Sequence, residues 1–220
     1  LIYGSYPDIL NQSADTQMLL RNLTDSYLYK DILATENIRK PDLLDKLLRA
    51  LAYQVGSEVS YNELAQTVGS DSKTVEKYIE LLEKCFIIFR LNGLSRNLRN
   101  ELKKAKKIYF YDNGIRNAVI QQFAPLEMRN DVGALWENFF ISERIKRNHY
   151  QQYYCNMYFW RTQSQQEIDY IEERDGMMTV FEMKWNPKKA NTTIPEAFLK
   201  AYPMKETTII TPENYLDWLL

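Results

Sequence analysis

The dipeptide Asp175-Gly176 lies between two apolar runs and constrains the fold more than any other feature of the chain. A type I′ hairpin turn needs positive φ at both central residues, and Asp-Gly is among the pairs that favour it most. Segments 166–173 and 177–184 are therefore predicted to be antiparallel strands. The two-residue turn pairs Arg174 with Met177, and every other pair follows from that one.

This register places four charged residues on one face of the hairpin, away from the turn. Asp169 faces Glu182, and Glu167 faces Lys184, because strand side chains alternate between faces. Opposed like charges destabilise a sheet, and partly buried carboxylates about 5 Å apart resist joint ionisation. Apolar residues fill the rest of both faces: Ile168, Tyr170, Ile171, Val180, Phe181 and Met183.

A divalent cation would turn this unfavourable arrangement into a favourable one. Mg²⁺ and Mn²⁺ take carboxylate oxygens together with water and phosphate oxygens, and Lys184 on the same face could hold a phosphate or orient an attacking water. We therefore predict a site for Mg²⁺ or Mn²⁺ at Asp169 and Glu182. The alternative is a solvated face, with Glu167 paired to Lys184 and Asp169 open to water.

The region before the hairpin has the pattern of three helices followed by a two-stranded ribbon. Pro41 and Gly56 bound the first helix, and Ser60 and Gly69 bound a short second one. A longer helix with Asp71 as its N-cap follows. The helix-turn-helix pattern and the strands CFIIFRL and KIYFYDNG have the layout of a winged helix.

Helical and strand signals alternate in the rest of the chain. After a helix over 113–123, Pro125 marks a boundary, and a strong helix over 131–148 is followed by strands near 154–161, by the hairpin, by a helix near 195–202 and by a strand at 206–211. The fold class expected is α/β, α+β overall. Three regions are predicted: a helical lead-in that links to an upstream module (1–40), a winged-helix domain (41–125) and an α/β domain (126–220).

The composition excludes several classes of protein. The net charge is −1, so only local clusters could attract nucleic acid. A single histidine excludes multi-histidine metal sites, and no phosphate-binding loop of the Walker type is present. No apolar stretch could span a membrane, so a cytoplasmic location is expected. The first residue is Leu, which suggests a processed chain or a fragment.

A basic segment follows the helix-turn-helix pattern and is the best candidate for nucleic-acid contact. It contains one acid, Glu101, and could bind the DNA backbone, form a solvated loop or dock another domain; these alternatives stay open. Its basic residues are Arg90, Arg96, Arg99, Lys103, Lys104, Lys106 and Lys107.

The hairpin motif, EIDYI followed by FEMK, resembles the PD-(D/E)xK nuclease superfamily. The resemblance covers about residues 126–220 and implies a restriction-endonuclease-like domain. It assigns Asp169 and Glu182 as metal ligands, Lys184 as the catalytic lysine and Glu137, in LWENFF, as a supporting acid. The proline of the family motif is absent, because Ile168 precedes Asp169.

Nearly the whole chain resembles the C-terminal part of prokaryotic AAA-type ATPases. The segments that carry this resemblance are LIYGSYPDIL, YLYKDIL, KKIYFYDNGIRNAV, GALWENFFISERI, YFWRTQSQQEIDYI and FEMK. Members of that family carry a nuclease-like domain after a winged helix, so the resemblance implies that ATP would be bound only by an upstream module.

Three functions are consistent with these features. The first is a metal-dependent DNA nuclease module of an AAA-type ATPase, with DNA and the upstream ATPase as partners and no membrane partner. The second is a non-catalytic module that binds DNA or protein and keeps a degenerate nuclease fold. The third, a stand-alone transcription regulator, leaves the acidic hairpin unexplained.

Overall fold

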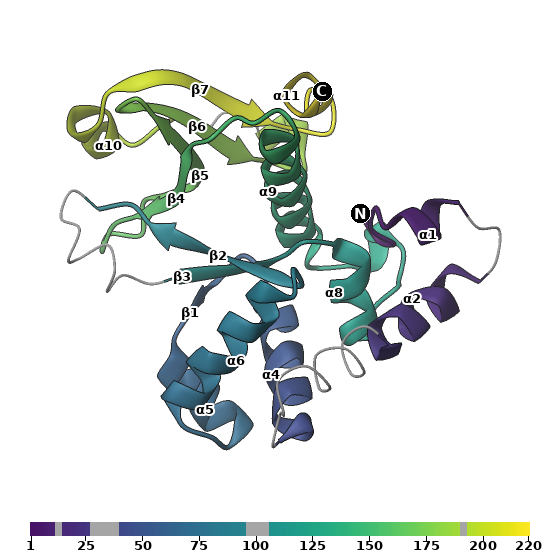
Figure 1. The fold of residues 1–220 in the computed structure, drawn as a ribbon. Helices are drawn as coiled ribbons and strands as arrows, with labels where there is room; N and C mark the ends of the chain where they lie inside the picture. Colours follow the sequence, from purple (N-terminus) through teal and green to yellow (C-terminus); the bar gives the residue numbers. More distant parts are fainter. Residues whose placement is uncertain (12–14, 27–39, 96–105, 190–192) are drawn as a thin grey trace. The chain divides into compact units, whose positions relative to one another are not determined.

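The computed structural model describes residues 1–11, 15–26, 40–95, 106–189 and 193–220. The chain has the expected mixed α/β fold and divides into two compact units (Figure 1). Unit 1 comprises Leu1–Arg90 and Ile108–Asp131, and unit 2 comprises Leu91–Lys107 and Val132–Leu220. The segment 91–107, which we assigned to the winged-helix domain, thus groups with the second unit.

Unit 1 is mainly helical, with strand order β1-β3-β2, and the unit boundaries cross strands β2 and β3. A 3-10 helix, Leu126–Met128, lies near its end. Its elements are α1 (Pro7–Leu10), α2 (Thr16–Thr24), α4 (Pro41–Tyr53), β1 (Glu58–Val59), α5 (Tyr61–Val68), α6 (Ser72–Lys84), β2 (Ile88–Gly93), β3 (Lys106–Phe110) and α8 (Asn113–Val119).

The two helices predicted over this pattern, α5 and α6, are present, and their ends are set by the expected residues. The Ser60 hydroxyl accepts a hydrogen bond from the backbone N–H of Glu63 at 3.4 Å, and a carboxylate oxygen of Asp71 accepts one from Thr74 at 2.9 Å. Gly69 ends α5 in the left-handed region, with φ of 72°. Local capping chemistry therefore accounts for both helices.

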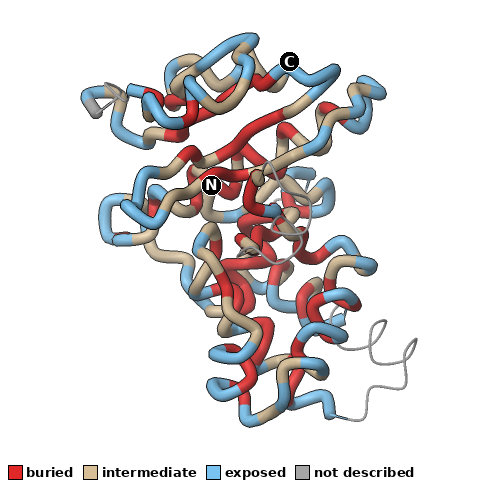
Figure 2. Tube along the Cα trace, turned by 90° about the vertical axis from the view of Figure 1, so that its left-hand side faces the viewer, coloured by how far each residue is buried: buried red, intermediate tan, exposed pale blue. Residues whose placement is uncertain are grey.

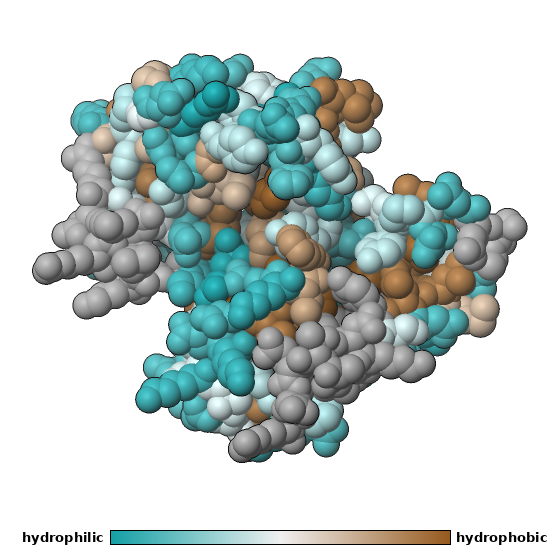
Figure 3. Space-filling model, viewed as in Figure 1, coloured by the Kyte–Doolittle hydropathy of each residue, from teal (hydrophilic) through white to brown (hydrophobic). Residues whose placement is uncertain are grey.

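Helix α2 follows its cap Asp15, whose carboxylate accepts hydrogen bonds from the N–H groups of Gln17 and Met18, and ends at Thr24. Residues 27–39 lie outside the described residues. Hydrophobic side chains gather around α1 and α2 on the face shown in Figure 3, and Leu10 and Met18 of these helices are exposed. Among the helices of the described segments, none has the length and apolar character needed to cross a bilayer.

Unit 2 contains the predicted hairpin within a sheet of strand order β2-β4-β5-β6-β7. The pairs Arg174 with Met177 and Tyr170 with Phe181 confirm the predicted register. Its elements beyond β2 and β3 are α9 (Val132–Tyr150), β4 (Asn156–Arg161), β5 (Glu167–Arg174), β6 (Met177–Met183), the 3-10 helix Pro187–Lys189, α10 (Glu196–Ala201), β7 (Met204–Ile210) and α11 (Leu216–Leu219).

Helices cover the two faces of this sheet. On one face, Phe140 of α9 contacts Phe181, with ring centroids 5.7 Å apart. On the other, Phe198 of α10 packs with Ile171 and Val180 in an apolar cluster. Figure 2 shows the buried residues concentrated in the interior and the exposed ones at turns. The hairpin is therefore buried on both faces, so charged side chains within it need partners.

Candidate active site

The predicted acidic face lies at the end of the hairpin that is remote from the turn. Asp175 and Gly176 have φ of 54° and 78°, as a type I′ turn requires. The side chains of Asp169 and Glu182 are 15% and 4% exposed, and that of Lys184 is 30% exposed. These values contradict the solvated alternative, in which Asp169 was open to water.

Lys184 lies within reach of both acids. Its Nζ atom is 3.1 Å from Oε2 of Glu182 and 4.0 Å from Oδ2 of Asp169. The backbone N–H of Met183 donates to the same Asp169 oxygen at 2.9 Å, so the side chain of Asp169 takes a hydrogen bond from the neighbouring strand. The structure therefore brings the two predicted metal ligands and the predicted lysine together.

Burial and mutual repulsion change how these groups titrate. Burial, with the charges of Asp169 and Glu137, raises the pKa of Glu182 to about 7. Burial also raises the pKa of Asp169, although Lys184 opposes that change. Burial alone would lower the pKa of Lys184, but the two acids outweigh it and hold that pKa above its usual value. The acid pair thus carries more negative charge than one lysine balances.

Glu137 and Glu167 have a different partner, Lys107. The Nζ atom of Lys107 is 2.6 Å from Oε1 of Glu167 and 3.3 Å from Oε1 of Glu137. Glu167 was expected to pair with Lys184 in the solvated alternative, but it binds Lys107, and Nε of Arg161 lies 3.9 Å from its other oxygen.

One carbonyl group, that of Ile210 at the end of β7, links helix α9 to Lys184. The indole N–H of Trp136 donates to the carbonyl oxygen of Ile210 at 3.3 Å, and the backbone N–H of Lys184 donates to the same oxygen at 2.9 Å. Glu137 follows Trp136 directly in α9, so the hydrogen bond from Trp136 to Ile210 also fixes where the backbone of Glu137 lies relative to β7.

The donor set suits a hard cation with open coordination positions. Among the described residues, no group of three or more His, Cys, Asp or Glu side chains is arranged to hold a metal ion. Two carboxylates are nevertheless enough for Mg²⁺, which keeps several waters and takes substrate phosphate oxygens. The buried, incompletely balanced pair Asp169 and Glu182 fits such an ion.

The basic segment is only partly described. Arg96, Arg99, Lys103 and Lys104 lie outside the described residues. Lys106 is half-buried, and Lys107, which we predicted to contact nucleic acid, is buried against Glu137 and Glu167. Lys106 is the first residue of β3, and every later residue of that strand is buried, so Lys107 lies in the interior while Lys106 lies at the strand's end.

A second buried ion pair in unit 2 was not predicted. Arg144 of α9 donates from Nε and Nη2 to the two oxygens of Glu172, both at 2.9 Å. Asn148 and the Tyr170 hydroxyl also donate to Glu172, at 2.6 and 3.2 Å. Glu172 lies within the hairpin and Arg144 on the predicted helix, but periodicity alone does not show which charged residues face inward.

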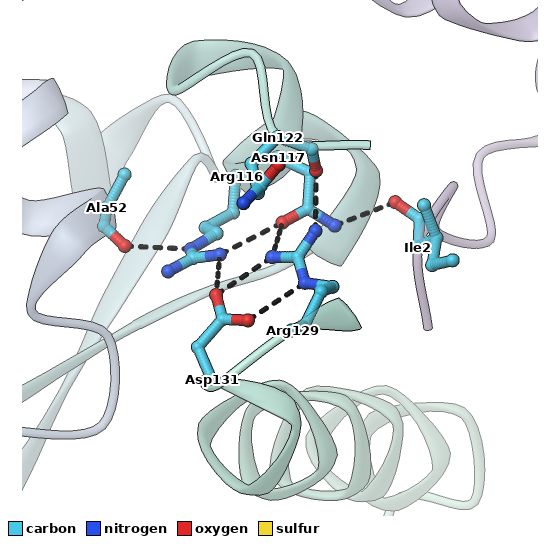
Figure 4. A network of polar contacts seen from close by, with 7 residues as sticks. All are labelled: Ile2, Ala52, Arg116, Asn117, Gln122, Arg129 and Asp131. Atoms are coloured by element: carbon cyan, nitrogen blue, oxygen red, sulfur yellow. Dashed lines mark hydrogen bonds and ion pairs between the residues drawn. The ribbon is translucent and has the colours of Figure 1, made fainter. Parts of the chain in front are cut away.

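Unit 1 contains a buried network around two arginines (Figure 4). Asp131 accepts hydrogen bonds from Arg116 at 2.6 Å and from Arg129 at 2.8 Å. The remaining bonds of the network reach the backbone carbonyls of Ile2, Ala52 and Gln122 and the side-chain amide of Asn117. The network joins segments distant in sequence, so its role is structural.

The Gly-Ser-Tyr-Pro stretch near the N-terminus has a physical explanation. Gly4 has φ of 74°, and a Cβ atom there would lie 2.0 Å from a carboxylate oxygen of Asp112. That carboxylate accepts hydrogen bonds from the backbone N–H groups of Ser5 at 2.7 Å and Ile115 at 3.0 Å. Glycine is therefore required where the N-terminal segment passes the cap of α8.

Two family models match the chain, one in each half. The model described as "Domain of unknown function (DUF8612)" matches residues 1–126. The chain belongs to this family. A second model, described as "Domain of unknown function (DUF4143)", matches residues 132–218, which include every residue of the candidate site except Lys107. Domains of this second kind are often found with AAA-type ATPases.

The chain is also similar to curated proteins without an assigned function. The uncharacterized proteins Mb2031c of Mycobacterium bovis and Rv2008c of Mycobacterium tuberculosis are each 27% identical over 139 residues, or 61% of this chain and 30% of the relative. An uncharacterized protein of Haemophilus influenzae is 25% identical over 124 residues, or 54% of this chain and 31% of the relative. The chain thus spans less than a third of these relatives. No solved structure matches it.

Proposed function

We propose that unit 2 is a metal-dependent phosphodiesterase module of the PD-(D/E)xK type that acts on DNA. The observation that carries this proposal is the buried pair of Asp169 and Glu182, with the Lys184 ammonium 3.1 Å from one carboxylate and 4.0 Å from the other. Two acids and a lysine at one point of a sheet are the groups that metal-assisted phosphodiester hydrolysis needs.

Each residue of the site has a role in this mechanism. Asp169 and Glu182 would hold Mg²⁺ or Mn²⁺, which supplies Lewis acidity toward a phosphate oxygen and lowers the pKa of a bound water. Lys184, displaced from the acids by the ion, would contact the phosphate or orient the attacking water. Glu137 would assist through its negative charge, which contributes to the raised pKa of Glu182.

Calorimetric titration of the full chain with Mn²⁺ and Mg²⁺ is the first test. Parent protein is expected to bind the metal, and Asp169→Asn to bind none, because the mutant keeps the shape of the side chain but loses its charge. Binding that is equal in the two proteins would place the metal elsewhere and refute the proposal.

Cleavage of DNA provides the second test. Lys184→Ala is expected to reduce cleavage by about 10²-fold or more while DNA binding is retained, since removal of one charged transition-state contact has effects of that size. A Lys184→Ala protein that cleaves as fast as the parent would contradict the role of Lys184. Single-stranded DNA, duplex DNA and RNA should be compared as substrates.

We further infer that unit 1 serves as a winged helix that binds DNA or docks an upstream AAA-type ATPase module, which alone would bind ATP. Helices α4, α5 and α6 followed by β2 and β3 support this inference. Docking is favoured by the state of Arg90, whose guanidinium pairs with Glu83 and donates to the Tyr61 hydroxyl instead of pointing to solvent.

The main alternative is a non-catalytic binding module with a degenerate nuclease fold. It predicts no metal binding at Asp169 and Glu182 and no cleavage of any nucleic acid. DNA binding that persists in the Asp169→Asn protein, without metal binding by the parent, would favour this alternative.

A further inference from the structure

Lys107 is a buried cation beside the candidate site, and the PD-(D/E)xK motif does not include it. Its side chain is 3% exposed, and its Nζ atom lies 2.6 Å from Glu167, 3.3 Å from Glu137 and 5.4 Å from the ring centre of Phe159. Burial alone would lower the pKa of Lys107, but Glu137 and Glu167 outweigh it and hold that pKa above its usual value. Lys107 is therefore a permanent positive charge.

The four acids of the site divide into two pairs, each with its own lysine. Lys107 contacts Glu137 and Glu167, whereas Lys184 contacts Asp169 and Glu182. The two lysines differ in how easily their ammonium groups can move away from the acids that they contact.

The side chain of Lys184 is 30% exposed, so its ammonium can move toward solvent or substrate when a metal ion enters. The side chain of Lys107 is enclosed, and withdrawal would leave two partly buried carboxylates without a cation. An incoming ion therefore has access to Asp169 and Glu182, whereas the second pair of acids already holds an enclosed cation, Lys107.

From this arrangement we propose that Lys107 is a positioning residue that stands where a second metal ion would bind and limits the site to one divalent ion. The inference rests on the proposed function and extends it. Oxygen atoms of Glu137 and Glu167 both lie within 3.3 Å of one nitrogen atom, and Mg²⁺ holds its oxygens at about 2.0–2.1 Å, so small shifts would let these acids bind an ion instead. The chemistry would then be one-metal hydrolysis, with Lys184 contacting the phosphate or orienting the attacking water.

The stoichiometry of Mn²⁺ binding to the full chain, measured by calorimetry, tests this inference without reference to activity. We expect one ion for the parent, two for Lys107→Met and one for Lys107→Arg, because Met keeps the length of the side chain and loses its charge while Arg keeps the charge. Two ions in the parent, or one in a folded Lys107→Met, would overturn the inference.

Different variants test the proposed function and this inference, so each can be refuted without the other. Asp169→Asn should bind no Mn²⁺, and this variant tests the proposed function. The double variant Asp169→Asn/Lys107→Met should bind one ion, now at Glu137 and Glu167. A double variant that binds no ion while Asp169→Asn also binds none would refute only the inference about Lys107.

A third variant covers the case in which Lys107→Met does not fold. The triple variant Lys107→Met/Glu137→Gln/Glu167→Gln removes the cation together with both of its acids, so no buried charge is left unpaired. It should bind one Mn²⁺ with an affinity within about threefold of the parent. Loss of that ion would show that Glu137 or Glu167 is a ligand in the parent and would overturn the inference.

Discussion

The hairpin carries a buried glutamate at each end, and the two have opposite surroundings. Near the turn, Glu172 is 1% exposed and accepts hydrogen bonds from Arg144 on both oxygens, from Asn148 and from Tyr170. Near the other end, Glu182 is bound by Lys184, whose side chain is partly exposed, and shares its environment with Asp169.

The difference between the two glutamates separates a structural charge from a functional one. A buried carboxylate whose hydrogen-bonding capacity is filled by rigid donors stabilises one conformation and has little capacity left for a ligand. A buried carboxylate next to another acid, paired with one partly exposed lysine, is destabilised in the absence of a further cation. The second arrangement costs stability and leaves capacity for binding.

The largest expected effect on stability follows from removing Arg144, the cation that pairs with Glu172. Arg144→Met should lower the free energy of unfolding by about 3–5 kcal/mol, because it leaves Glu172 buried without its cation. Urea unfolding at pH 7 measures this. Arg147→Met, three residues along the same helix, is the control, since Arg147 donates from Nη1 to the side chain of Asn148 at 3.3 Å rather than to Glu172. An equal loss of unfolding free energy in both variants would show that any substitution in this part of helix α9 destabilises the protein.

Removing the charges of both Arg144 and Glu172 tests whether the loss in Arg144→Met comes from the unpaired carboxylate. Arg144→Met/Glu172→Met should recover most of the stability lost in Arg144→Met, since a buried ion pair replaced by apolar side chains is often close to neutral. If the double variant is as unstable as Arg144→Met alone, packing of the arginine, which lies over the Phe181 ring, is the dominant contribution.

A smaller effect of opposite sign is expected at the other end of the hairpin. The folded-state pKa of Glu182 is raised to about 7, so the folded protein binds more protons than the unfolded chain between about pH 4.5 and pH 7. Stability from this group therefore falls as the pH rises through that range. Glu182→Gln should remove the fall and gain about 1–3 kcal/mol relative to the parent between pH 5 and pH 8.

Unfolding in urea at several pH values, without divalent metal, measures the effect of Glu182→Gln. Glu173→Gln, at a half-buried position near the turn of the same hairpin, is the matched control for replacing a glutamate by glutamine. A Glu182→Gln protein that loses stability relative to the parent as the pH rises would contradict the view that this carboxylate is destabilising.

The smallest expected effect concerns a single hydrogen bond that Glu172 accepts. Tyr170→Phe keeps the buried ring and removes the hydroxyl that donates to Glu172 at 3.2 Å. The expected loss is about 0.5–1.5 kcal/mol of unfolding free energy, the usual contribution of one hydrogen bond. A loss as large as that of Arg144→Met would mean that the network acts as a unit, which a double-mutant cycle with Arg144→Met would reveal.

Much of the fold was predictable because its signals are local. The caps Ser60, Asp71 and Asp15 and the break at Gly69 place helix ends, and each acts through atoms only a few residues away. The site residues Asp169, Glu182 and Lys184 were predictable for a related reason, since the two-residue turn sets which residues share a face.

Long-range ion pairs were not predictable in this way. The pattern alone paired Glu167 with Lys184 in the solvated alternative, and only the packed structure shows Lys107 as its partner. The same holds for Arg116, whose partner Asp131 lies 15 residues along the chain and comes beside it only after α8 and the following loop have folded.

The sequence by itself determined the hairpin, its register and the face that bears the acids, because turn geometry and side-chain alternation act between neighbours. The tertiary structure alone decided which cation serves which acid. Lys107 and Glu137 are 30 residues apart and come from a strand and a helix, so their contact depends on how those elements pack. Charge pairing depends on distance in space, and a sequence records distance only along the chain.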